Sequence, residues 1–417
     1  MLLINEFDSI DKLFFTLGIV LTLTNLIYRL MAKFGRPLVL GGITAGVIIQ
    51  HLNLPTKYFD IHAISGLGQM GIVMFMMLVG NQLNFKNLLI RKRYMPITLI
   101  NMLIPFILGF IFAGLLVHNH LPWLNGQFLS FYNTSITDSH LNLMFEIFVG
   151  LAVSMTAFPV LSMFLKHTHL VNTNVGSLAL LCGFVDEIFL WVILGVILIS
   201  SQQNEIISSF APIDFIAYLI FIIGIAPKLL TYVVPRIKRE STMLGFLIIG
   251  CFASAALADS VNLHQIFGAF LFGLILPRNN EMIVGLRKNL FLLINTILLP
   301  IYFVETGVAA NIVISFNYTT ILMIVIFTLI ALIGKFGGSF ITGKFMGMSN
   351  NESTMLGSLL NMRGIIEIIL LNVGLDIGII NNKIYTILLT MAMICTFFAT
   401  SLSLYLRKKL ALSKIQE

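Results

Sequence analysis

The stretch Phe184-Val185-Asp186-Glu187-Ile188-Phe189-Leu190-Trp191 decides the fold, because it sets two adjacent acids in the middle of an apolar run over residues 174–200. A run of this length can cross a lipid bilayer as a helix. One charge at the centre of a bilayer costs at least ~2.5–3.5 kcal/mol on insertion scales, and each of two neighbouring acids makes ionisation of the other harder. The default interpretation of such a pair is a site on an ion or proton path.

The composition indicates a membrane protein with many spans rather than a large soluble domain. Of the 417 residues, 58% are hydrophobic and only 10% are charged. The net charge of +7 belongs to the loops of such a protein, so no nucleic-acid partner is expected. All three cysteines lie in apolar runs without a CxxC spacing, so neither a disulfide framework nor a zinc site is expected. No other metal site and no cofactor is expected.

The hydropathy pattern predicts an all-α membrane protein of about thirteen transmembrane helices. Together they form a single membrane domain over residues 1–417, and no soluble regulatory domain is expected. The expected spans cover residues 13–32, 37–53, 66–84, 95–117, 143–166, 174–200, 211–233, 241–260, 264–277, 289–309, 319–345, 353–374 and 384–406.

Basic residues are unevenly shared between alternate loops. If the N-terminus lies outside, most of the 25 basic residues fall in inside segments, and outside segments hold only Lys12, Lys57 and Lys383. Because cytoplasmic loops are enriched in Lys and Arg, the pattern predicts a cell-membrane protein with its N-terminus outside and its C-terminus in the cytoplasm. Lys335 and Arg363 are exceptions, since both lie deep within expected spans.

Two expected spans carry signals that interrupt a helix. In span 5, Pro159 removes a backbone donor and disfavours a helical conformation at the preceding residue. Thr156, just before it, can offer an oxygen to the freed backbone or to an ion. In span 12, Asn361 and Gly364 belong to a polar, glycine-flanked middle section. We therefore predict a helix break in each span.

The positions of these breaks suggest two related halves. Spans 5 and 12 are seven apart, as expected for inverted repeats over residues 13–200 and 241–406 joined by a linker span at 211–233. Interrupted helices at corresponding places in two halves indicate a transporter site between them. The predicted architecture is thus an inverted-repeat transporter fold with two discontinuous helices.

At this point the sequence resembles a known family. His264-Gln-Ile-Phe-Gly-Ala-Phe-Leu-Phe-Gly273-Leu-Ile-Leu-Pro277, Thr156-Ala-Phe-Pro159-Val-Leu161 and Asn361-Met-Arg363-Gly364-Ile-Ile-Glu367 are similar to collinear motifs of the monovalent cation:proton antiporters. The closest likeness is to the branch that contains the Kef-type systems and the plant cation/H+ exchangers. The resemblance extends over residues 13–406. It implies an inverted-repeat antiporter fold in which the two discontinuous helices, spans 5 and 12, cross, and it also implies a homodimer.

The register of this resemblance gives the two acids unequal roles. It places Glu187 where the family has its transport Asp, so Glu187 is expected to be the main exchanging carboxylate and Asp186 a second carboxylate or ligand. The resemblance also implies Thr156 as a candidate ligand and Lys335 as the charge partner of Asp186. Glu187 departs from the family pattern, because its carboxylate is one methylene longer than that of Asp.

Arg363 and Glu367 are expected to form an internal ion pair that holds the break of span 12. Residues four apart lie on one helix face if the segment between them is helical. Simpler interpretations stay open for several residues: the acid pair as a static partner of the buried cations, Lys335 as a purely structural residue, and Pro159 as an ordinary transmembrane kink.

These observations predict a secondary antiporter that exchanges Na+ or K+ for protons across a cytoplasmic membrane by alternating access. It is expected to be a transporter and not an enzyme, with a monovalent cation, protons and the lipid bilayer as its partners. Two alternatives remain: a Kef-type cation efflux channel, and an exporter of another small ion or solute on the same scaffold.

Overall fold

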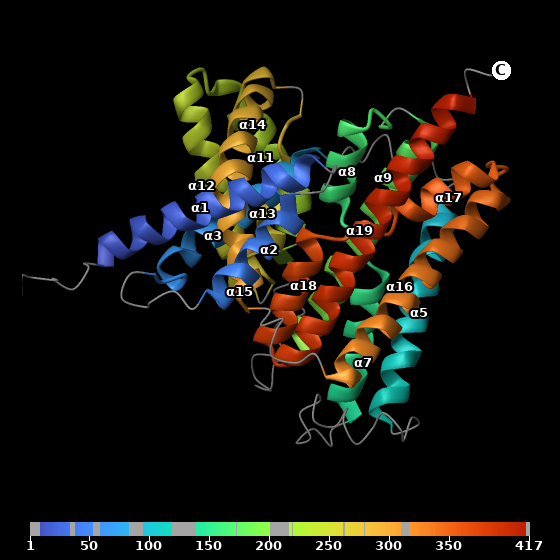
Figure 1. Ribbon diagram of the computed structural model, residues 1–417. Coiled ribbons are helices and arrows are strands. Elements are labelled where there is room, and N and C mark those ends of the chain that lie inside the picture. Colours follow the sequence, from blue (N-terminus) through green and yellow to red (C-terminus); the bar gives the residue numbers. More distant parts are fainter. Residues whose placement is uncertain are drawn as a thin grey trace, which may run out of the picture. The chain divides into compact units, whose positions relative to one another are not determined.

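The computed structural model describes residues 9–33, 38–52, 59–82, 95–118, 139–171, 173–200, 217–218, 220–261, 263–278, 280–309 and 317–413 (Figure 1). Within these residues the secondary structure is entirely helical, which confirms the predicted all-α class. Part of the expected linker span (residues 211–216 and 219) and most of loop 118–142 lie outside the described residues, as do basic loop residues such as Lys86.

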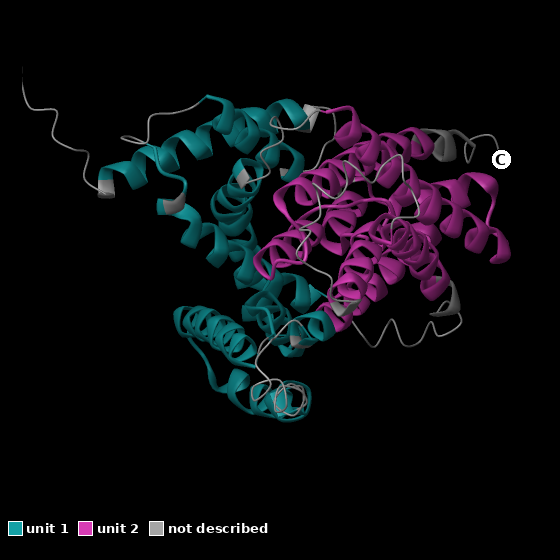
Figure 2. Cartoon of the chain, turned by 90° about the horizontal axis from the view of Figure 1, so that it is seen from below, with its two compact units in different colours: residues 1–33, 38–86, 195–309 teal, residues 34–37, 87–194, 310–417 magenta. Residues whose placement is uncertain are grey.

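Contacts along the chain divide it into two compact units (Figure 2). Unit 1 comprises residues 1–33, 38–86 and 195–309, and unit 2 comprises residues 34–37, 87–194 and 310–417. Helix α9, Asn174–Ser200, belongs to unit 2 up to residue 194.

The other helices of unit 1 come from the first and middle parts of the chain. They are α1 Ser9–Lys33, α2 Leu38–His51, α3 His62–Gln82, the π-helical η2 Phe221–Ile225, α11 Ala226–Val233, the 3-10 turn η3 Val234–Arg236, α12 Glu240–Ser260, α13 Gln265–Ile275, α14 Glu281–Leu293, the π-helical η4 Ile294–Leu298 and α15 Leu299–Ala309.

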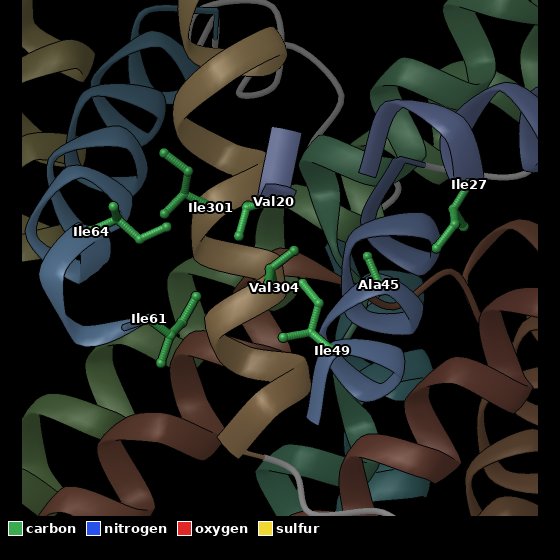
Figure 3. Packing of buried hydrophobic residues seen from close by; sticks show 8 residues of the cluster. All are labelled: Val20, Ile27, Ala45, Ile49, Ile61, Ile64, Ile301 and Val304. Carbon is green, nitrogen blue, oxygen red and sulfur yellow. The ribbon is translucent and has the colours of Figure 1, made fainter. Parts of the chain in front are cut away.

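The core of unit 1 lies where α1, α2, α3 and α15 meet. Figure 3 shows buried aliphatic side chains from all four helices pointing toward one another. Helices α2 and α15 approach so closely that a Cβ added at Gly46 would overlap the backbone at Val304 and Gly307. Small residues allow such close backbone packing between transmembrane helices.

Unit 2 contains the remaining helices. They are α5 Met95–Val117, α7 Ser139–Ser154, α8 Phe158–His167, most of α9, α16 Tyr318–Phe345, α17 Asn350–Leu359, α18 Ile365–Asp376 and α19 Asn382–Ser413. Helix α5 packs against both α7 and α16, and α16 also packs against α17 and α19 (Figure 1). All of the predicted site residues lie in this unit.

Nine helical segments of the described chain are long and apolar enough to cross a membrane, and α2 and α13 are shorter apolar helices. Each expected span overlaps a described helical segment, although the total of thirteen stays a prediction. Spans 5 and 12 are discontinuous, as the predicted fold requires. Span 5 is broken at residues 155–157 between α7 and α8, and span 12 at residues 360–364 between α17 and α18.

Candidate ion-binding site

The two acids of α9 are sealed inside unit 2. Asp186 is 2% exposed and Glu187 is 0% exposed. Because consecutive residues of an α-helix are turned about 100° from each other, the two carboxylates point in different directions. Asp186 Oδ2 accepts a hydrogen bond from Lys335 Nζ at 2.5 Å, whereas neither carboxylate oxygen of Glu187 has a hydrogen-bond partner in the described part of the chain.

Lys335 connects three helices. It lies fully buried on α16, and its Nζ donates to Asp186 of α9 and, at 2.5 Å, to the main-chain oxygen of Ser154. Ser154 is the last residue of α7, and the final carbonyls of a helix have no partner within that helix. The break of span 5 therefore presents a main-chain acceptor, and Lys335 occupies it.

Arg363 binds the two carbonyls that precede this one. Its Nη1 donates to Ala152 O at 2.5 Å, and its Nη2 donates to Val153 O. The same Nη1 lies 3.2 Å from Glu367 Oε1, which forms the buried ion pair. Two cations thus bind three successive carbonyls at the C-terminus of α7, the end at which the helix dipole favours positive charge.

The two broken spans are also joined to each other directly. Ala157 N donates to Met362 O at 2.9 Å, and the Thr156 hydroxyl donates to Leu360 O at 2.7 Å. Pro159 lies in the first turn of α8, a position at which a missing N–H leaves no helical bond unmade. Each break therefore supplies hydrogen-bond partners for the other.

The remaining predicted residues lie in the break of span 12. Asn361 is fully buried, and its Nδ2 donates to Gly357 O at 2.8 Å. Gly364 directly precedes the first residue of α18. Arg363 therefore precedes this helix, so its pairing with Glu367 spans the start of α18 instead of following one helix face.

Sequence reasoning missed Thr396 of α19. Its hydroxyl accepts from Arg363 N at 3.0 Å and donates to Arg363 O at 2.9 Å, so one side chain binds both main-chain groups of a non-helical residue. The acceptors Ala152 O and Val153 O were missed as well. Main-chain oxygens carry no residue-type signal, and only the predicted break of span 5 could have indicated that they were free.

The site contains several side-chain oxygen atoms that lack a hydrogen-bond donor among the described residues. Glu187 has both carboxylate oxygens unpaired, and Asp186 Oδ1 and Asn361 Oδ1 are also without a hydrogen-bond partner among the described residues. Oxygen ligands suit hard cations, and a carboxylate can instead carry a proton. Across the described residues no group of three or more His, Cys, Asp or Glu side chains could hold a metal ion.

Comparison with known proteins places this geometry in a family. Residues 18–408 match the family model described as sodium/hydrogen exchanger, transmembrane. The chain belongs to the sodium/hydrogen exchanger family. The predicted family is confirmed, and this exchanger is a multi-pass membrane transporter rather than an enzyme.

Individual relatives of this exchanger carry cation/proton antiporter names. It is 28% identical to the Na(+)/H(+) antiporter NhaS4 of Synechocystis sp., over 92% of this chain and 94% of that protein. It is also 28% identical to K(+)/H(+) antiporter 1 of Saccharomyces cerevisiae and to cation/H(+) antiporter 17 of Arabidopsis thaliana, in each case over 96% of this chain. The chain spans about half the length of these two, 47% and 49% respectively.

A solved structure shares the fold of this exchanger. The sodium proton antiporter MjNhaP1 from Methanocaldococcus jannaschii matches it with a TM-score of 0.64 and 15% identity. The match covers 96% of this chain and 99% of that one. It therefore supports the predicted antiporter fold over nearly the whole length of the chain.

Proposed function

We propose that this chain is a secondary antiporter that exchanges a monovalent cation, Na+ or K+, for protons by alternating access. The observation that carries the proposal is the unequal state of the two adjacent acids. Asp186 is paired with Lys335, whereas Glu187 is equally buried and has no hydrogen-bond partner among the described residues. The names of the relatives support the same exchange.

Glu187 is the primary exchanging group in this proposal. An ionised carboxylate without a partner is strongly disfavoured in a low-dielectric interior, so it takes up a proton or binds a cation. Both occupants neutralise the same carboxylate, and they therefore exclude each other. A site that holds either one and faces each side in turn performs exchange.

Asp186 and Lys335 add a second, charged step. A cation that binds Asp186 competes with the Lys335 ammonium for the same oxygen, because Nζ lies 2.5 Å from Oδ2. Release of Lys335 as a neutral amine sends its proton to water while the cation takes its place beside Asp186. With Glu187 also giving up a proton, two protons leave for one cation, and exchange carries net charge.

The remaining residues of the site bind or position its other groups in this proposal. They are Thr156, Pro159, Asn361, Arg363, Gly364 and Glu367. The Thr156 hydroxyl lies 2.7 Å from Leu360 O and also beside the Asp186 carboxylate, so its oxygen can join Asp186 as a cation ligand. Arg363 and Glu367 hold the two breaks together through the α7 carbonyls. Inverted repeats over residues 13–200 and 241–406, with a linker at 211–233, would allow the two breaks to alternate between sides.

The surroundings of the exchanger are part of the same proposal. We place it in the cell membrane with its N-terminus outside and its C-terminus in the cytoplasm, on the asymmetry of basic residues between loops. We further propose a homodimer. Helix α1 exposes large apolar side chains, including Phe14 and Leu26, that would suit either lipid or a second copy.

Purified protein in sealed vesicles tests the exchange. A preset pH gradient should collapse when Na+, K+ or Li+ is added, and the cation that acts at the lowest concentration identifies the substrate. Absence of cation-driven proton movement at every pH from about 6 to 9, a range toward which burial can shift a carboxylate, would contradict the proposal. Cation flux without opposed proton movement would favour a channel.

A further inference from the structure

The buried face of α16 changes character at Lys335. On the N-terminal side, the buried face mixes the large apolar side chains of Met323, Ile324 and Phe327 with Ala331 and three threonines. On the C-terminal side, every buried residue is small or polar: Gly338, Ser339, Thr342 and Gly343. The C-terminal half thus buries no large apolar side chain, and its hydroxyls lie among small residues and polar groups of neighbouring helices.

A continuous set of polar contacts leads away from Lys335 along this half. The Ser339 hydroxyl contacts Lys335 O at 2.6 Å and also donates to Asn101 Oδ1 of α5. One turn further, Thr342 Oγ1 lies 2.9 Å from Gly338 O and 3.0 Å from Ser339 O. Ser353 of α17 lies next, since a Cβ added at Gly343 would sit 2.8 Å from its Oγ.

Several polar groups along this set have no partner in the described chain. Asn101 Nδ2 and Ser353 Oγ are buried without a hydrogen bond, and both residues are fully enclosed. Pro105 lies inside α5 and has no N–H to give to the main-chain oxygen of Asn101, four residues earlier. Buried polar groups in native proteins are rarely left unsatisfied, and ordered water is the usual partner when the protein supplies none.

There is also space beside Asn101. A methyl group added at Gly338 would meet its nearest neighbours, Ile104 Cδ1 and Asn101 Cα, at 3.5 and 3.7 Å, and would lie 3.8 Å from Asn101 Oδ1. These are ordinary van der Waals distances, so the glycine leaves room for a small group. The helix rises about 10.5 Å over the seven steps from Lys335 to Thr342, which brings the set close to the end of α16.

We propose that Asn101, Ser339, Thr342 and Ser353 line a hydrated proton path between Lys335 and the aqueous phase at the C-terminal end of α16. This inference rests on the proposed exchange, because it assigns the route by which the Lys335 proton leaves. The ammonium gives one proton to the first water, and a hydronium charge passes along the path. The neutral amine and the Asp186 carboxylate stay behind. The reverse transfer restores the ion pair.

The charges that face Lys335 favour a route separate from the cation. The charged groups that act on Lys335 are Asp186 of α9 and Arg363, and both belong to the ion-binding site described above. The described residues of the path carry hydroxyls and one amide but no carboxylate. Such a path can pass a proton between waters, yet it lacks the anionic oxygen that would attract a metal cation.

Thiol labelling tests whether the path is hydrated, without relying on transport. We would place Thr342→Cys and, as a control, Ala331→Cys in a protein whose three native cysteines are replaced by serine or alanine. Both residues are buried on α16 on opposite sides of Lys335, and Ala331 has no polar side-chain group that could hold water. A small aminoethyl methanethiosulfonate should label Thr342→Cys from the C-terminal side of α16 and spare Ala331→Cys. Absence of labelling at 342, or equal labelling at both, would overturn the path.

Exchange rates provide the second test, with glycine variants as a matched pair. Gly338→Ala fills the space beside Asn101, whereas a methyl at Gly337 meets nothing within 4 Å. Both changes raise helix propensity equally, so a folding defect is not expected. Gly338→Ala and Asn101→Leu should slow proton release on the order of tenfold, less than the roughly 100-fold or more lost with a direct proton-transfer group, because Lys335 itself is retained. Both should leave the half-saturating cation concentration unchanged. Gly337→Ala should match the wild type.

Wild-type rates in both Gly338→Ala and Asn101→Leu would overturn the path whatever the labelling result. A wild-type protein that exchanges nothing would refute the proposed function, and the labelling pattern would still decide whether the path is hydrated.

Discussion

The Lys335–Asp186 pair joins two different helices, α16 and α9, whereas the Arg363–Glu367 pair joins residues four positions apart at the start of one helix. Both pairs lie in unit 2, and all four side chains are almost completely buried. The two pairs thus experience similar burial but differ in how the chain connects them. A relative shift of two helices can separate the first pair, while the second moves as one body.

The cations of the two pairs are also anchored differently. Lys335 has one further contact, to Ser154 O, and its ammonium is a point charge on a flexible stem. Arg363 uses its planar fork on two carbonyls, and Thr396 fixes its main chain. A buried ion pair can thus be built for release or for permanence. Under the proposed exchange, the first pair takes part in transport and the second has a structural role.

The largest expected effect on exchange comes from substituting Glu187, the acid next to the Asp186–Lys335 pair. Glu187→Gln should reduce exchange by at least about 100-fold, because the amide can neither carry the proton nor bind a cation with a full negative charge. Thermal unfolding should stay close to that of the wild type, since Glu187 makes no hydrogen bond in the described chain. Glu187→Asp is the control and should retain exchange. A wild-type rate in Glu187→Gln would move the main role to Asp186.

Whereas Glu187→Gln should mainly reduce transport, Arg363→Leu should mainly reduce stability. It leaves Glu367 buried without its partner and frees the carbonyls of Ala152 and Val153, so the expected loss of stability is about 3–5 kcal/mol. Thermal unfolding in detergent measures this loss of stability, and added Na+ or K+ should not restore the lost stability. Arg363→Lys keeps the positive charge but lacks the planar guanidinium, so its stability should lie between those of the wild type and Arg363→Leu. A fully stable Arg363→Leu protein would remove the distinction between the two pairs.

Lys335→Ala should uncouple exchange from membrane potential more than it unfolds the protein. Asp186 then lacks its ammonium, but a cation can replace it, and a cation at about 100 times its Kd adds about 2.7 kcal/mol of stability. The measurements are the voltage dependence of exchange and the cation-dependent shift in Tm. Unchanged voltage dependence together with a large, cation-insensitive loss of stability would make Lys335 a structural residue like Arg363.

The smallest effect is expected at Thr396. Thr396→Val removes the hydroxyl that binds both main-chain groups of Arg363, at an expected loss of about 1–3 kcal/mol of stability for a buried group left unsatisfied. Thr396→Ser should restore most of it. A valine variant as stable as the wild type would mean that Arg363 is fixed by its side chain alone.

Local signals in the sequence predicted the helical class and the positions of the breaks. Pro159 and the polar section around Asn361 mark the ends of helices directly, because a proline and a glycine-flanked turn act on the backbone next to them. The family register named Asp186 and Lys335, which the structure brings within 2.5 Å. It could not give the reason, since their contact depends on how three helices pack.

The unpredicted part of the site consists of contacts without a sequence pattern. Arg363 reaches Ala152 O and Val153 O across more than two hundred positions, and any residue type at 152 or 153 would offer the same oxygen. Thr396 is one of several hydroxyl residues on α19, and only the packing of α19 on the break distinguishes it. Such contacts follow from the tertiary fold and not from local chemistry.

The capped end of α7 has a consequence for how the protein is made. Ala152 O and its Arg363 donor are 211 residues apart in the chain, and Ser154 O and Lys335 are 181 apart. At roughly 5–20 residues per second of synthesis, these carbonyls wait on the order of 10–40 s for their partners to leave the ribosome. Until then the α7–α8 break must stay in contact with water or an insertion factor, so biogenesis of unit 2 ends with its last helices rather than proceeding span by span.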